Sequence, residues 1–367
     1  MTKIKHTLVH IVGARPNFMK AAPVLRALDK YSAKVRQVLV HTGQHYTENM
    51  SDVFFTELGI PKPDVNLHVG SGTHAQQTSA IMTAFEPVAM ELRPDLTFVY
   101  GDVNSTVAAA LVCAKLGLKI VHVEAGLRSF DRTMPEEINR LLTDQLADLL
   151  FTPSLDGNVN LRREGVAKNK IFFVGNVMID TLIRFLPAAQ QRSQEIRERH
   201  GLGEYGIATI HRPANVDDLD TLRPILGALD EISREIKLVF PVHPRTLKNL
   251  GDEAKSLTKN MLLLEPLSYL DFLALQASAK LIITDSGGVQ EEATYLRVPC
   301  LTLRPNTERP VTVTEGTNIL IDRNLPRLKK EVKAILKGKK NKHRLPKYWD
   351  GKAAERIAKV TIDHLRG

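Results

Sequence analysis

Three carboxylates stand where a catalytic acid or base would be placed. Asp102 and Glu124 follow the apolar runs LTFVYG and KIVHV, and Glu136 lies in the segment RTMPEEINR. Carboxylates held in a partly dehydrated cleft can exchange protons with a substrate as general acids or bases. Asp102 and Glu136 could instead cap helices, so the residue types alone leave both roles open.

The segment TDSGGVQEEATYL, residues 284–296, is the clearest candidate for anion binding. It predicts a strand that runs into a turn of small residues and then into a helix. The amides of Ser286, Gly287 and Gly288 would face a phosphate, and the helix dipole would favour its charge. Glu291 or Glu292 would accept hydrogen bonds from a ribose, unless both only complement the helix dipole.

Polar residues also follow the other apolar runs of the chain. Ligands of open parallel sheets bind beyond the carboxyl ends of the strands, so these positions are candidate contacts. Arg15 and Lys20, in GARPNFMK, would flank an anion at a second helix start. His211 in TIHRPAN and His243 in FPVHPRT stand at strand ends as well. The remaining candidates of this kind are Gln44, Asn176, Arg212 and Asp285.

The common cofactor and metal signatures do not occur in this sequence. It has neither G-x-G-x-x-G nor G-x-x-x-x-G-K-[ST], which argues against NAD binding and against P-loop nucleotide hydrolysis. It has no HExxH and no His/Cys ligand spacing, so we expect no metal and no cofactor. Cys113 and Cys300 each lie in an apolar run, which predicts two buried thiols and no disulfide.

Short β-branched runs alternate with longer amphipathic runs, which is typical of parallel sheets covered by helices. A length of 367 residues suits two domains. We therefore expect two doubly wound, Rossmann-like α/β domains, residues 1–176 and 177–352, with the active site in the interdomain cleft. The closing helix, 353–367, would pack back on the first domain. The expected strands are 7–12, 35–41, 96–100, 119–123, 149–152, 171–175, 206–210, 237–242, 261–264, 280–284, 299–303 and 318–321, and helix caps are expected at 104–106, Ser154 and Asp217.

The formal net charge of +9 comes from one segment. Residues 327–347 contain ten Lys or Arg residues and one Glu. The segment has no interleaved aromatic residues, and LKKEVKAILKG is typical of an amphipathic helix with a solvated face, so we expect neither nucleic-acid nor membrane binding. The sequence has no 18-residue apolar run and no secretory signal, which predicts a soluble, cytoplasmic protein.

Taken as a whole, the sequence resembles the non-hydrolysing UDP-N-acetylglucosamine 2-epimerases of bacteria and archaea. The resemblance covers essentially the whole chain in order, and VEAGLR with PEE-x-NR and DSGG-x-QEE is its most specific part. The segments that carry it are GARPNFMKAAP, YGDVNST, HVEAGLRSFDRTMPEEINRLLTD, FVGNVMID, HRPAN, FPVHP, TDSGGVQEEA, TERPVTVTEGTN and DGKAAERI.

This resemblance implies a fold similar to the GT-B glycosyltransferases, a homodimer, and interconversion of UDP-GlcNAc and UDP-ManNAc for cell-envelope polysaccharides. The reaction would eliminate UDP across carbons 1 and 2, leaving a bound 2-acetamidoglucal. UDP would then be re-added, with a proton delivered to the other face of carbon 2. The resemblance assigns catalysis to Asp102, Glu124, Glu136 and His211, the last assisting the leaving diphosphate, and UDP contacts to Arg15, Lys20, Ser286, Gly287, Gly288 and Glu292.

The sequence departs from the family pattern at two motifs. The commoner GTRPE is GARPN here, so Asn17 replaces a glutamate, and HRRE is replaced by HRPA. Many bacterial members bind a second UDP-GlcNAc as an activator next to the active site. Gln44, Arg212 and His243 remain as candidate contacts for such a molecule or for the sugar.

Three other activities are compatible with the same motifs. The nearest is 2-epimerisation of UDP-2,3-diacetamido-2,3-dideoxyglucuronic acid, which needs an extra cationic contact from Arg128, Arg132 or Arg212. A hydrolysing epimerase would have to admit water to the glucal. A GT-B type glycosyltransferase would need an acceptor groove, for which the basic segment is a candidate, but the three carboxylates suit proton transfer better.

Overall fold

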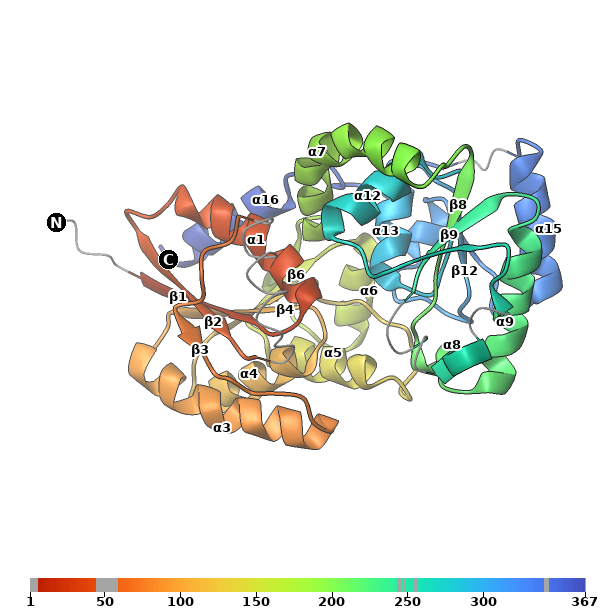
Figure 1. Cartoon of the computed structure of the whole chain (residues 1–367). Coiled ribbons are helices and arrows are strands. Elements are labelled where there is room, and N and C mark those ends of the chain that lie inside the picture. The colour runs from red at the N-terminus through yellow and green to blue at the C-terminus, as the bar shows by residue number, and fades with distance from the viewer. Residues whose placement is uncertain are drawn as a thin grey trace. The chain divides into compact units, whose positions relative to one another are not determined.

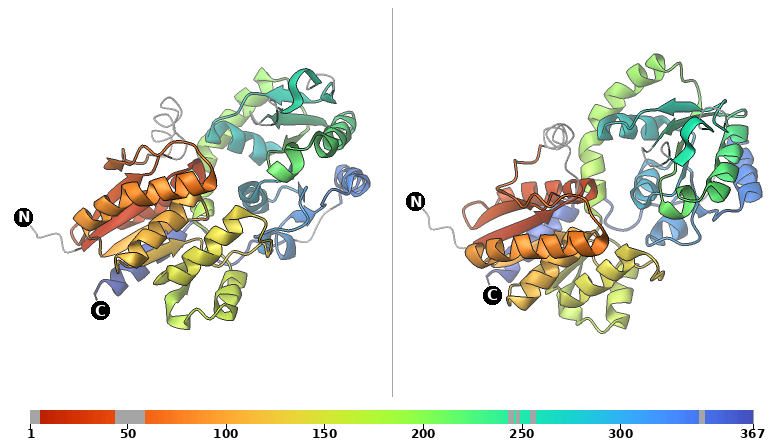
Figure 2. Two further views of the ribbon diagram at one scale, coloured as in Figure 1. Left: turned by 90° about the horizontal axis from the view of Figure 1, so that it is seen from below. Right: turned by 60° about the horizontal axis from the view of Figure 1, so that its bottom comes forward.

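The structure is a computed structural model of the 367-residue chain. It describes residues 6–43, 59–242, 246, 249–253, 257–339 and 343–366, except for the side chains of Arg15 and Asp252. The chain divides into two compact units, Met1–Thr181 with Lys347–Gly367, and Leu182–Pro346. Each unit is a parallel β-sheet with helices on both faces (Figures 1 and 2).

The sheet of the first unit has seven strands in the described residues, in the order β3-β2-β1-β4-β5-β6-β7, and all its pairs are parallel. Every residue of β4 and β5 is buried, because helices cover both faces of a parallel sheet. The strands are β1 (His6–Val12), β2 (Val35–His41), β3 (Val65–Asn66), β4 (Leu96–Tyr100), β5 (Ile120–Val123), β6 (Leu149–Thr152) and β7 (Ile171–Phe173).

Two groups of helices cover this sheet. Helix α1 contacts α16, whereas α3, α4 and α5 contact one another in turn, and Figure 1 shows the two groups on opposite faces. The helices are α1 (Arg15–Asp29), α3 (His74–Leu92), α4 (Asn104–Lys115), α5 (Pro135–Leu146), α6 (Leu155–Arg163), α7 (Val177–Arg199), which continues into the second unit, and α16 (Ala353–His364).

The last helix belongs to the first unit. Lys30, at the C-cap of α1, and Glu355 of α16 form an ion pair with 2.9 Å between Nζ and Oε1. The carboxylate of Asp180, in α7, accepts hydrogen bonds from the first amides of α16, at 3.2 Å from Ala353 and 2.7 Å from Ala354. Asp180 therefore caps a helix that lies far away in the sequence.

The second unit has a six-stranded parallel sheet in the described residues, in the order β10-β9-β8-β11-β12-β13. Helix α9 contacts α15, and α12 contacts α13. The strands are β8 (Tyr205–Thr209), β9 (Lys237–Pro241), β10 (Leu262–Leu264), β11 (Leu281–Thr284), β12 (Cys300–Thr302) and β13 (Asn318–Leu320). The helices are α8 (Pro213–Val216), α9 (Leu219–Ile232), α12 (Tyr269–Ser278), α13 (Gly287–Leu296), α14 (Val311–Thr314) and α15 (Leu325–Leu336).

The basic segment forms α15 and the chain after it. Leu328, Val332 and Ile335 of this helix are buried, one turn apart, against the second sheet's core. Four cations of the basic segment form ion pairs. In α15, Lys329 pairs with Glu231 and Lys333 with Glu235. In the chain after the helix, Lys339 pairs with Glu331 and Arg344 with Glu315. The helix is therefore amphipathic, as predicted. Among the described residues, no helix is long and apolar enough to cross a membrane.

All the predicted strands overlap observed ones, and among the described residues only β3, two residues long, was not predicted from the sequence. The predicted thiols Cys113 and Cys300 are buried and unbridged. Two predicted caps are wrong. Val103, not 104–106, precedes α4, and α9 is capped by Asp218 instead of Asp217. Ser154 is at the N-cap of α6, where it makes no side-chain capping bond.

Asp180 gives the first unit a pH-dependent stability. Burial raises the pKa of Asp180 from 3.8 to about 6, despite the two capping hydrogen bonds. A carboxyl with a raised pKa stabilises the fold at low pH and loses that contribution as pH rises through the folded value. We expect the free energy of unfolding of the wild type, relative to Asp180→Asn, to fall by about 1–3 kcal/mol between about pH 4 and pH 7.

The exposed cap of α9 is the matched control. Hydrogen bonds from Thr221 and Asp220 lower the pKa of Asp218, so the stability of the wild type relative to Asp218→Asn should rise with pH. Chemical denaturation at each pH measures both differences. A pH-independent difference for Asp180→Asn would contradict the rise in pKa that burial causes.

Candidate functional site

The strand order reverses once in each sheet, between β1 and β4 in the first and between β8 and β11 in the second. Ligands of open parallel sheets bind at such reversals, beyond the carboxyl ends of the strands. Lys20 in α1 and Asp102 after β4 belong to the first reversal. His211 after β8 and Ser286 after β11 belong to the second. The sequence-predicted residues thus fall at the expected edge of each sheet.

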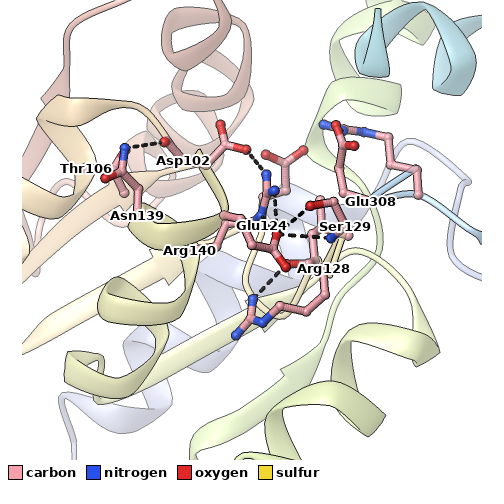
Figure 3. A network of polar contacts seen from close by, with 12 residues as sticks. Asp102, Thr106, Glu124, Arg128, Ser129, Asn139, Arg140 and Glu308 are labelled. Atoms are coloured by element: carbon pink, nitrogen blue, oxygen red, sulfur yellow. Dashed lines mark hydrogen bonds and ion pairs between the residues drawn. The ribbon is translucent and has the colours of Figure 1, made fainter. Parts of the chain in front are cut away.

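Glu124, which follows β5, forms a buried ion pair with Lys20. Each residue is 5 % exposed, and Figure 3 shows Glu124 close to Asp102 at this edge of the sheet. A buried charge needs a partner of opposite sign, and Lys20 supplies it. Glu124 also has a φ of +77°, in the left-handed region, which costs a residue with a side chain about 1–3 kcal/mol.

Gly101 makes room for this ion pair. It has a φ of +64°, and a Cβ at this position would lie 2.5 Å from Nζ of Lys20 and 3.2 Å from Oε2 of Glu124. Any side chain here would therefore displace one of the two charged groups. The turn between β4 and Asp102 requires glycine for both its conformation and its space.

Asp102 pairs with Arg140, a buried arginine of α5 (Figure 3). The same guanidinium contacts Glu137 at 2.6 Å and 3.0 Å, so Arg140 lies between two carboxylates. The amide of Asn139 donates to the Asp102 carbonyl at 2.9 Å. Helix α5 thus holds both the backbone and the side chain of Asp102.

The adjacent residues Glu136 and Glu137 have different environments. Glu137 is buried and accepts hydrogen bonds from the Ser129 amide and hydroxyl and from the Phe130 amide. Burial alone would raise the pKa of Glu137, but the Ser129 and Arg140 bonds outweigh it and the pKa is lowered. Glu136 is only half-buried, and its side chain pairs with no other described residue. Of the two, Glu136 is the one available to a substrate.

Asn17, at the position where the commoner family motif has glutamate, joins α1 to β4. Its Oδ1 accepts from the amides of Gly13 and Ala14, and its Nδ2 donates to the Tyr100 carbonyl at 2.7 Å. A carboxylate has no hydrogen to donate, so a glutamate could not make the last bond. Asn17 therefore fixes the end of β4 directly before Gly101 and Asp102.

In the second unit, Asp285 orients His211. The buried carboxylate of Asp285 accepts from the amides of His211 and Arg212 and lies 3.2 Å from Nδ1 of His211. Nδ1 of the ring therefore faces Asp285, and Nε2 is on the ring edge away from it. The His211 side chain is 39 % exposed, which leaves it accessible.

Helix α13 begins at Gly287 beside a buried cluster of charges. Glu308 contacts Arg309 at 2.5 Å and Arg304 at 2.7 Å, and Arg212 lies 3.5 Å from it. A Cβ on Gly287 would come within 2.8 Å of Glu308 Oε1 and closer still to Arg309. This helix start therefore combines the backbone amides of a helix N-terminus with nearby arginines, an arrangement that favours phosphate.

The two candidate ribose residues of α13 are both buried, at 1 % and 4 % exposure. Glu291 contacts Arg309, with 2.8 Å between Oε1 and Nε, and so belongs to the charge cluster. Glu292 accepts from Nε2 of Gln276 at 2.7 Å. Because Glu291 is already paired with an arginine, Glu292 remains the candidate for a ribose.

Some predicted residues lie outside the described part. Gln44 and His243 are not described, and only the backbone of Arg15 is, at the first position of α1.

Sequence reasoning missed Arg140 and Arg309 as site residues. The i,i+3 spacing of Glu137 and Arg140 was an available signal, whereas Arg309 is separated from Glu291 by the whole of β12.

Comparison with known protein families identifies the family of this chain. Residues 26–361 match the family model described as UDP-N-acetylglucosamine 2-epimerase. The chain belongs to the UDP-N-acetylglucosamine 2-epimerase family. Epimerases are isomerases, so the predicted enzyme class is confirmed.

Individual relatives match along their whole length. A UDP-N-acetylglucosamine 2-epimerase of Methanocaldococcus jannaschii is 45 % identical over 361 residues, which are 95 % of this chain and 97 % of that protein. A crystal structure of a Methanocaldococcus jannaschii UDP-GlcNAc 2-epimerase in complex with UDP-GlcNAc and UDP has a TM-score of 0.90 at 44 % identity and covers 97 % of this chain and 99 % of that one. The predicted two-domain, GT-B-like Rossmann fold is thereby confirmed.

One relative in this family carries a different substrate in its name. The UDP-2,3-diacetamido-2,3-dideoxy-D-glucuronate 2-epimerase of Pseudomonas aeruginosa is 41 % identical over 357 residues, 96 % of this chain and 98 % of that protein. The rival substrate predicted from the sequence is therefore represented among close relatives. The carboxylate of its sugar needs a cation as a contact, and the candidates for this contact are Arg128, Arg132 and Arg212.

Arg128 cannot serve that purpose. Its side chain is 1 % exposed and contacts Asp144 at 2.7 Å, Glu164 at 2.6 Å and 2.8 Å, and the Leu127 carbonyl at 2.7 Å. Nε, Nη1 and Nη2 of Arg128 thus all have acceptors within the protein. The prediction that Arg128 could contact a sugar carboxylate is therefore wrong. Arg132 is exposed, and Arg212 lies near Glu308.

Gly101→Ala tests the Lys20–Glu124 ion pair. The added Cβ should displace Lys20 or Glu124 and lower epimerase turnover by at least about tenfold. Gly117→Ala is the matched control, since Gly117 has a φ of +69° with nothing within 4 Å of a Cβ. Both variants share the backbone cost of a left-handed alanine, about 1 kcal/mol. Equal turnover in the two variants would show that the crowding at Gly101 is irrelevant.

Proposed function

We propose that this protein interconverts UDP-N-acetylglucosamine and UDP-N-acetylmannosamine by epimerisation at carbon 2. The observation that carries the proposal is the set of carboxylates at the carboxyl edge of the first sheet, two of them paired with Lys20 and Arg140. The relative of 45 % identity with this named activity supports the same substrate. Asp102, Glu124 and Glu136 are the proposed acid and base groups.

Elimination and re-addition of UDP is the proposed route. UDP leaves carbon 1 with the bonding electrons, a base takes the carbon 2 proton, and the product is a planar 2-acetamidoglucal. Return of UDP to carbon 1 and of a proton to the opposite face of carbon 2 inverts that centre. The two faces need separate acid and base groups, which a set of carboxylates can supply. Bound water is not a reactant, so the reaction is not a hydrolysis.

The second unit is proposed to bind the UDP part. The amides of Ser286, Gly287 and Gly288 at the start of α13 bind the diphosphate, and Glu292 accepts from the ribose. His211, oriented by Asp285, donates to the leaving diphosphate. Arg15 and Lys20 are assigned to UDP as well, although Lys20 also neutralises Glu124.

The diacetamido-uronate remains the second candidate substrate. The Pseudomonas aeruginosa relative favours it. With Arg128 occupied, Arg132 or Arg212 would have to bind the sugar carboxylate. Because nucleotide sugars are charged and do not cross membranes unaided, we propose that either reaction takes place in the cytoplasm.

Proton NMR in deuterated water tests the proposal. With UDP-GlcNAc, we expect deuterium at carbon 2 and the appearance of UDP-ManNAc. Glu136→Gln should abolish most of this exchange without changing thermal stability. Glu137→Gln, its matched control, should lower stability because it breaks a buried carboxylate–arginine contact, a change of about 3–5 kcal/mol.

Other outcomes would redirect the assignment. Release of free N-acetylmannosamine would identify a hydrolysing enzyme. No reaction with UDP-GlcNAc, together with turnover of the diacetamido-uronate, would establish the second candidate. Full exchange in Glu136→Gln would remove that residue from the chemistry.

We also propose a homodimer that buries an apolar surface on α5 and α6, two helices joined by a hydrogen bond from Gln145 to the Glu164 carbonyl. This α5–α6 surface consists of exposed side chains one helical turn apart, Ile138 with Leu142 and Leu155 with Val159. Monomers rarely leave such apolar faces uncovered.

Light scattering after size-exclusion chromatography checks the dimer. We expect the wild type to elute as a dimer and Ile138→Glu to shift it toward monomer. Leu345→Glu is the control, because Leu345 is 36 % exposed, close to the 39 % of Ile138, but belongs to the second unit. A monomeric wild type, or an equal shift in the control, would contradict the interface.

A further inference from the structure

Asp144 of α5 holds the chain on both sides of Glu124. One carboxylate oxygen lies 2.6 Å from Nδ1 of His122, two residues before Glu124. The other accepts from the amide of Gly126, two residues after it, at 3.0 Å. The intervening backbone carries the left-handed φ of Glu124. Asp144 therefore spans the part of the chain that has this unfavourable conformation.

The same interaction extends to the turn before Asp102. Nε2 of His122 lies 2.8 Å from the Gly101 carbonyl. A carbonyl oxygen only accepts, so Nε2 carries a hydrogen, and the ring links Asp144 to the residue that precedes Asp102. Asp144 thus reaches the turns that carry both Asp102 and Glu124.

The charges around Asp144 are balanced inside the protein. Asp144 and His122 are fully buried, and Arg128 contacts Asp144 at 2.7 Å and Glu164 at 2.6 Å. Burial alone would raise the pKa of Asp144, but His122 and Arg128 outweigh it and the pKa is lowered. Arg128 and the ring of His122 therefore compensate the buried carboxylate of Asp144, which accepts all these bonds.

We propose that Asp144 is a positioning residue that holds Asp102 and Glu124 in their working geometry through His122 and the Gly126 amide. The proposal rests on the function proposed above, in which those two carboxylates act on the sugar. A buried ion pair that only stabilises the fold would have no reason to contact the chain on both sides of a carboxylate residue with a left-handed backbone. Small displacements of such groups reduce turnover far more than they reduce stability.

Two substitutions separate geometry from charge. Asparagine has nearly the shape of aspartate. In Asp144→Asn the amide can donate to Nδ1 of a neutral His122 while the oxygen accepts from Gly126 and Arg128, so most of the wild-type kcat should remain. Asp144→Glu keeps the charge but moves the oxygens by one methylene, so kcat should fall by about a hundredfold. KM should change much less in both, because the groups that Asp144 contacts, on His122, Gly126 and Arg128, are not assigned to UDP.

Asp148→Glu is the matched control. Asp148 accepts from the Ile120 amide at 3.0 Å, at the opposite end of β5 from Glu124. The same lengthening there should leave kcat close to that of the wild type. If Asp144→Glu does not fold, His122→Asn provides the second test. Its amide can still reach Asp144 but not the Gly101 carbonyl, so kcat should again fall while UDP affinity is kept.

Crystal structures of the variants give a readout that does not depend on activity. We expect the φ of Glu124 to remain near +77° in Asp144→Asn and to leave the left-handed region in Asp144→Glu. A wild type that turns over neither UDP-sugar would refute the proposed function, while the change in φ would still test Asp144. Equal loss of kcat in both variants, or an unchanged φ in Asp144→Glu, would overturn the positioning role.

Discussion

The buried ion pair between Lys20 and Glu124 is the constraint on which the first unit's site depends. A carboxylate that is 5 % exposed is tolerated only beside an opposite charge, and the pair joins the first helix of the unit to the end of β5. The space for it requires glycine at position 101. The backbone that presents Glu124 has a left-handed conformation, so neighbouring groups must hold it there.

The second unit also contains a buried carboxylate, and here several cations surround it. Glu308 lies among Arg212, Arg304 and Arg309, and burial would raise its pKa if these cations did not lower it well below its ordinary value. Three arginines face two acids in this cluster, Glu308 and Glu291, beside the amides of Ser286 and Gly287. A carboxylate inside the cluster holds the guanidinium groups in place without cancelling their charge. Such a site is suited to a diphosphate before and after it leaves the sugar.

The sequence predicted the sheets well and the partners of the site residues poorly. Parallel strands such as LTFVY are buried on both faces, so they are visible as continuous apolar runs, whereas β3 has only two residues and leaves no such signal. Polar residues at strand ends were visible for the same reason. Their partners were not, because Lys20 and Glu124 are 104 residues apart and Asp102 and Arg140 are 38 apart. Which cation meets which acid depends on how the helices pack across the sheet.

The neighbours Glu136 and Glu137 show why residue type alone could not settle the roles. Successive residues on a helix point about 100° apart, so only one of the two faces the loop at Ser129, although both lie within about one turn of Arg140. Glu137 does, and its hydrogen bonds to Ser129, Phe130 and Arg140 leave it no capacity for a substrate. Glu136 then presents its carboxylate on another face of the same helix, a turn away from the arginine that holds Asp102. The structural glutamate and the proposed catalytic one thus differ only in the direction that α5 gives them.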